Sequence, residues 1–143
     1  MKWSMYFVCA LGLLLTHAAF AQVKPKEDKI DLELQSCLDK KENQTTAGMV
    51  DCAYKALSQW DAKLNTTYKS LLAKLDSTAK NTLIEAQRQW IKFKEKEIDL
   101  IDATYGSAQG TMWRIMRAQK VMNITKDRAI ELENLLETMG QMR

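Results

Sequence analysis

Apolar side chains recur at steps of three and four residues along most of the chain, the spacing that gathers them on one face of an α-helix. One stripe runs from Met49 to Leu75, a second from Leu83 to Tyr105, and a third from Met112 to Leu136. The first consists of Met49, Cys52, Ala53, Ala56, Trp60, Leu64, Tyr68, Leu71, Leu72 and Leu75. No segment shows the sustained alternation of a β-strand, so the sequence predicts an all-α fold.

Short polar segments separate the stripes and predict where the helices begin and end. Thr46 is expected to cap the first long helix, and Asp76 or Ser77 the second. Gly106 is expected to end the second long helix, since glycine tolerates a left-handed backbone there. A shorter helix is expected over 30–40. Because short connections favour antiparallel neighbours, we predict an antiparallel bundle of three long helices with a short N-terminal helix.

The first 21 residues are typical of a secretory signal peptide. Lys2 precedes an apolar stretch, and an Ala-Phe-Ala sequence ending at Ala21 presents small residues at a cleavage site. An uncleaved anchor is the alternative, but a spanning helix needs about 20 apolar residues and this run is shorter. We expect cleavage after Ala21, a periplasmic or secreted location, a flexible leader over 22–29 and one helical domain over 30–143.

The expected mature chain keeps two cysteines, Cys37 and Cys52, and loses the single histidine. Zinc needs about four ligands, usually Cys and His, and a redox pair prefers the Cys-x-x-Cys spacing. In an oxidising compartment the remaining interpretation is a structural disulfide. Closing a loop of this size stabilises the fold by about 3 kcal/mol. We therefore expect the bond Cys37–Cys52 to fasten the short helix to the first long one, with no metal and no cofactor.

The chain offers few side chains that are suited to catalysis. Without histidine or a free thiol, Ser-His and Cys-His nucleophiles are excluded, and there is no Gly-rich phosphate-binding motif. A carboxylate pair could act as in glycosidases. The densest acidic run comprises Glu95, Glu97, Asp99 and Asp102. Lysines interleave with it, which favours a solvated helix face, so we expect a protein that is not an enzyme.

Charge excludes a second class of function. Removing residues 1–21 lowers Lys+Arg from 21 to 20 and leaves Asp+Glu at 18, a net charge of +2. These charges are spread along the chain, whereas nucleic-acid binding uses a clustered basic face. No second apolar segment is long enough to span a membrane. A protein partner is the remaining expectation.

Several pieces of the sequence, in this order and spacing, resemble the lysozyme-inhibitor LprI-like family of small exported bacterial domains. Asp-x-x-Leu-Asn-x-x-Tyr from Asp61 and Ala-Gln-x-x-Trp from Ala86 are specific when they occur together. The other matching pieces within 37–132 are Cys37, Met49-Val50-Asp51-Cys52, Leu83, Gly106-Ser107 and Thr125-Lys126-Asp127-Arg128-Ala129. The resemblance implies inhibition of lysozyme through protein–protein contact.

The chain departs from this family in two places. Many members carry a second cysteine pair, but Ile98 stands at its first position and no cysteine follows Cys52. Members often have Arg where Lys94 stands. The same fold is still implied, with the region 98–124 expected to be looser or to serve a different partner.

Two features are candidates for contact with a partner. Trp60 and Trp90 lie on apolar stripes and are expected in the core, whereas Trp113 lies beside its stripe and is a candidate exposed anchor. The loop that starts with Tyr105, Gly106 and Ser107 and ends at residue 110 is the only one suited to block an enzyme cleft. The alternative for this loop is a simple turn between two helices.

The leading hypothesis is inhibition of lysozyme or another peptidoglycan hydrolase, which includes immunity against the hydrolase of a rival bacterium. The alternative is a structural or accessory periplasmic protein that binds another protein without inhibiting it. A net charge of +2 supplies no long-range attraction to a basic animal lysozyme. A local acidic patch over 95–102 is therefore expected to compensate if such an enzyme is the target.

Overall fold

The computed structural model describes residues 27–142, and every regular element in this part of the chain is helical. The elements are α1 (Lys29–Leu38), the 3-10 turn η1 (Lys41–Asn43), α2 (Thr46–Lys74), α3 (Ser77–Tyr105) and α4 (Met112–Gln141). The prediction of an all-α fold is confirmed. The expected signal peptide, its cleavage site and most of the leader lie outside the described residues. Within 27–142, no helix combines the length and apolar character needed to cross a membrane.

Polar side chains fix where the helices begin. Asp28 and Asp76 accept hydrogen bonds of 2.9 Å from backbone N–H groups in the first turns of α1 and α3. The cap of α2 is Thr45, one residue earlier than predicted. Thr45 has the extended backbone of a capping residue, whereas Thr46 is already helical.

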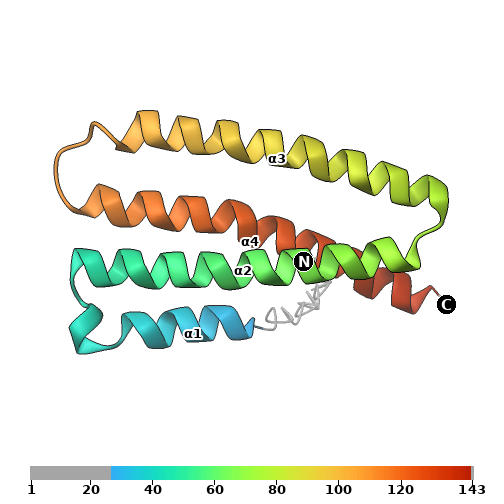
Figure 1. Ribbon diagram of the computed structural model, residues 1–143. Helices are drawn as coiled ribbons and strands as arrows, with labels where there is room; N and C mark the ends of the chain where they lie inside the picture. The colour runs from blue at the N-terminus through green and yellow to red at the C-terminus, as the bar shows by residue number, and fades with distance from the viewer. Residues whose placement is uncertain (1–26, 143) are drawn as a thin grey trace, which may run out of the picture.

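Consecutive helices alternate in direction, so α2 and α4 run the same way (Figure 1). α2 packs chiefly against α4 and only slightly against α3, its neighbour in sequence, while α1 packs on α2 and α3 on α4. Four alanines on α2 and α4 are at most 1% exposed: Ala53, Ala56, Ala118 and Ala129. Small side chains at a contact let helix axes approach closely, so the tightest pair of this bundle is parallel and not antiparallel.

The core is built around Trp60, which is fully buried as predicted. It clusters with Leu71, Met122 and Leu132 from α2 and α4. Trp90, also predicted in the core, is half-buried and packs against this cluster from α3. The expectation is confirmed for Trp60, while Trp90 lies at the edge of the core.

Helix α1 is fastened to the bundle by polar and covalent links, since none of its residues is fully buried. The predicted disulfide Cys37–Cys52 joins it to α2.

Ion pairs add to this attachment. Asp28, the capping residue of α1, pairs with Lys63 of α2, whose Nζ also lies 2.7 Å from a carboxylate oxygen of Glu133. Further along α1, a carboxylate oxygen of Asp31 lies 2.7 Å from Lys126 Nζ of α4. Lys63 and Lys126 also hold their ammonium groups 5.2 and 5.5 Å from the centre of the Trp60 ring.

This ionic attachment makes stability depend on pH. Partial burial raises the pKa of Asp28, but hydrogen bonds from Lys63 and from the backbone N–H of Ile30, with the nearby positive charges, lower it overall. A carboxyl group with a lowered folded-state pKa adds stability above its unfolded pKa of about 3.9, and loses it as pH falls through the folded value. We therefore expect the melting temperature to fall below about pH 4.

Asp28→Asn should reduce this acid dependence, because asparagine keeps the helix cap but cannot titrate. Thermal melts between neutral and acidic pH measure the effect. Asp127→Asn, which removes an exposed carboxylate from α4, controls for the change in net charge. Equal acid dependence in Asp28→Asn and in the unmodified protein would show that the Asp28–Lys63 pair does not hold α1.

Candidate functional site at the α3–α4 turn

The loop over residues 106–111 arches beyond the ends of α3 and α4, at the same end of the bundle as η1 (Figure 1). Ser107 and Gln109 are exposed, and Met112, at the start of α4, is 68% exposed. No residue of the loop is charged. The tip therefore offers small polar side chains followed by one exposed apolar side chain.

Two glycines shape the loop in different ways. Gly106 has right-handed helical angles (φ −66°, ψ −30°), so the expected left-handed end of α3 is wrong at this position. Glycine is needed there because a Cβ atom would lie 2.5 Å from the Asp102 carbonyl oxygen. The left-handed conformation occurs instead at Gly110, with φ of +103°.

The structure brings together two of the predicted contact residues across the base of the loop. The rings of Tyr105 and Trp113 have their centres 5.6 Å apart, within the range of favourable aromatic pairs. Lys120 Nζ lies 5.9 Å from the centre of the Tyr105 ring. Trp113 is half-buried and packs beside Tyr105 at the base of the loop.

An arginine ties three helices together close to this loop. Arg117 of α4 donates through Nε and Nη2 to both carboxylate oxygens of Asp102 on α3, at 2.5 and 2.9 Å. Its Nη1 donates to the Tyr54 hydroxyl of α2 at 2.7 Å. The hydrogen bond from Arg117 is the main cause that lowers the pKa of Asp102. This bidentate pair links α3 to α4 near the loop that joins them.

Two of the four carboxylates in the acidic run on α3 pair with neighbouring cations. A carboxylate oxygen of Asp99 lies 2.9 Å from Lys96 Nζ, and Asp102 is held by Arg117. Only Glu95 and Glu97 of this run have no ion pair among residues 27–142. Pairing of Asp99 and Asp102 weakens the expected acidic patch, and Glu95 and Glu97 are left to attract a basic enzyme. In the same part of the chain, no group of three or more acidic, His or Cys side chains is placed to hold a metal ion.

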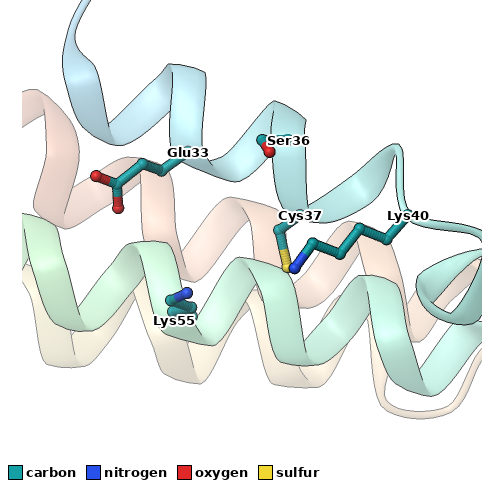
Figure 2. Close-up of a pocket in the computed structure, with 5 residues that line it drawn as sticks. All are labelled: Glu33, Ser36, Cys37, Lys40 and Lys55. Atoms are coloured by element: carbon teal, nitrogen blue, oxygen red, sulfur yellow. The ribbon is translucent and has the colours of Figure 1, made fainter.

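A pocket of about 230 Å³ opens between α1 and α2 beside the disulfide. Its lining side chains, shown in Figure 2, are Glu33, Ser36, Cys37, Lys40 and Lys55. Sequence reasoning did not single out any of these except Cys37. In the sequence these residues share only their nearness to Cys37 or Cys52. Nearness to a cysteine does not by itself predict a pocket.

Among solved structures, the chain resembles that of an uncharacterized protein from Burkholderia thailandensis, with a TM-score of 0.76 and 28% sequence identity. The match covers 81% of this chain and 57% of that one, so this chain spans less than two thirds of its length. The comparison with curated proteins returned no match. A protein family described as lysozyme inhibitor LprI matches residues 37–132, and the chain belongs to this family.

Proposed function

We propose that this chain is an exported, non-catalytic protein that inhibits lysozyme or another peptidoglycan hydrolase. The observation that carries the proposal is membership in the lysozyme inhibitor LprI family over residues 37–132. Cleavage after Ala21 would release the mature chain into the periplasm or the medium, where peptidoglycan hydrolases act. The Cys37–Cys52 disulfide fits such an oxidising location.

The contact with the enzyme is assigned to the α3–α4 turn. Tyr105 and Trp113 brace the loop at its base, Gly106 permits the close passage at the end of α3, and Ser107 is exposed at the tip. A braced loop loses less conformational entropy on binding than a free one. Small side chains at the tip let it enter a cleft that is lined by two carboxylates.

Local charge supports insertion into an acidic cleft better than attraction to a basic surface. Two of the four carboxylates of the α3 acidic run are paired, so the run attracts a basic lysozyme only weakly. Besides Arg117, which is paired with Asp102, the cations beside the loop are the exposed Arg114 and Lys120, which lies over Tyr105. Positive groups around an uncharged tip complement the two carboxylates of the enzyme cleft.

The experiment is lysis of peptidoglycan-bearing cells by a panel of lysozymes, with and without the oxidised chain 22–143. A dose-dependent loss of lysis with one enzyme type supports the inhibitor and names the target. No effect across the panel would contradict it. The alternative, an accessory envelope protein without inhibitory activity, would then become the leading function.

Replacing Ser107 and Gln109 with tyrosine should raise the concentration needed for half-inhibition by about tenfold or more, equivalent to about 1.4 kcal/mol. Bulky side chains at the tip would prevent the loop from entering the cleft. Titration of lysis against the S107Y/Q109Y variant measures the change. Gly106 is left unchanged because any side chain there would meet the Asp102 carbonyl and disturb the end of α3.

The matched control places the same side chains at the opposite end of the bundle, where α2 turns into α3 (Figure 1). Lys74 and Thr78 are exposed there, and K74Y/T78Y should inhibit like the unmodified protein. Circular dichroism should show equal helicity in both variants. Full inhibition by S107Y/Q109Y would move the contact away from the loop.

A further inference from the structure

The pocket between α1 and α2 has the size of a site for one side chain. Its volume is about 230 Å³, below the roughly 300–1,000 Å³ of pockets that hold drug-sized ligands. In Figure 2 the side chain of Lys40 extends back toward Cys37, and Lys55 faces the same space from α2. The pocket is therefore a small surface depression that can receive a small polar group.

The lining carries an excess of positive charge. Neither Lys40 nor Lys55 forms an ion pair with another residue in 27–142, whereas the one acidic lining residue, Glu33, is already engaged. A Glu33 carboxylate oxygen accepts a hydrogen bond of 2.6 Å from Gln59 Nε2, and the other lies 3.6 Å from Lys29 Nζ. Two lysines against one carboxylate leave the lining with a net charge of +1, which favours a negatively charged ligand.

Ser36 adds a neutral hydrogen-bond donor beside these charges. It is exposed on α1 and lines the same pocket. Hydroxyl and ammonium groups can each donate to a carboxylate oxygen, and charge-assisted hydrogen bonds are about twice as strong as neutral ones. The disulfide supplies an apolar wall against which the methylene groups of an acidic side chain can pack.

We propose that this pocket binds the carboxylate of an acidic side chain presented by a protein partner. An exposed ion pair contributes at most about 1 kcal/mol, so two lysines hold a free carboxylate only weakly. The same pocket becomes useful when the rest of a protein surface supplies further contacts, as standard interfaces do. The pocket lies on α1 and α2, apart from the α3–α4 loop, so it adds a binding site to the proposed inhibition.

A titration of the isotope-labelled, oxidised chain 22–143 followed by NMR tests the proposal. The probes are a short capped peptide of glutamate and glycine, the same peptide with glutamine, and sodium acetate. The glutamate peptide should shift the backbone amide signals of Ser36, Lys40 and Lys55, and it should bind more tightly than acetate. The glutamine peptide should leave these signals unchanged. No hydrolase is present, so the result is independent of the proposed inhibition.

A pair of double variants tests whether these lysines are the ligands. K40Q/K55Q should weaken binding of the glutamate peptide by roughly tenfold, since two charged contacts are lost. K69Q/K92Q removes the same charge from exposed positions of α2 and α3 outside the pocket and should bind like the unmodified chain. Both lysine pairs are on the surface, so the fold is expected to persist in each variant.

Three results would overturn the proposal. Equal weakening in both double variants would mean attraction to net charge alone. Shifts spread over many lysines, without a maximum at the pocket, would mean that no site exists. Acetate binding as tightly as the glutamate peptide would make the pocket a site for small anions and not for a protein side chain.

Discussion

Trp60→Ala is expected to lower the free energy of unfolding by about 3–5 kcal/mol, the usual cost of replacing a buried tryptophan with alanine. Trp60 is fully buried in the cluster that joins α2 to α4. Lys63 and Lys126 lie against its ring from both helices, so the cavity would also loosen the attachment of α1. For a chain of this size, the melting temperature should fall by on the order of 10–20 °C.

Trp60→Phe is the matched comparison. The Trp60 Nε1 atom is buried and has no hydrogen-bond partner, so its removal costs no hydrogen bond. Phenylalanine keeps an aromatic ring in the same place, and its effect should be well below that of alanine. An equal loss in both variants would contradict the expectation that an aromatic ring in this place retains most of the stability.

Cys37→Ser should lower the free energy of unfolding by about 2–4 kcal/mol, in the range measured for loss of a disulfide. The bond closes a loop between residues separated by 15 positions. Helix α1 has 10 residues and no fully buried side chain, and isolated helices below about 12–15 residues are marginal in water. Loss of the bond should therefore lower the melting temperature and fray α1, as measured by far-ultraviolet circular dichroism.

Reduction of the unmodified protein is the control for this variant, because it breaks the same bond without changing the sequence. The double variant C37S/C52A removes the free thiol that Cys37→Ser leaves in the core, where Cys52 is 2% exposed. All three samples should melt at similar temperatures. An unchanged melting curve after reduction would mean that packing and ion pairs alone hold α1.

Much of the helical architecture could be predicted because its signals are local. The stripe from Met49 to Leu75 and the capping residue Asp76 depend on spacings of three or four residues, and both have counterparts in the structure. The left-handed backbone predicted for Gly106 was wrong. Glycine is needed there because the chain passes close to the Asp102 carbonyl, which the local sequence does not show. Thr45 and Thr46 are both good caps, and only the backbone angles distinguish them.

Contacts between distant parts of the chain could not be predicted from the sequence. Arg117 meets Asp102 and Tyr54 because three helices come together, and nothing in its own segment indicates these partners. The pocket near Cys37 likewise depends on how α1 lies on α2. Residues of the α3–α4 loop could be selected from composition alone, whereas the pairing of Tyr105 with Trp113 needed the geometry.

The parallel pairing of α2 with α4 has a consequence for how the chain reaches its fold. The two helices that share most of the core are separated in sequence by the whole of α3 and its loop, so their association must close a long loop. Folding rates fall as such non-local contacts come to dominate. The disulfide shortens only the path from α1 to α2, so an oxidised chain still faces this entropic barrier. We expect the slow step of folding to be the return of α4 onto α2.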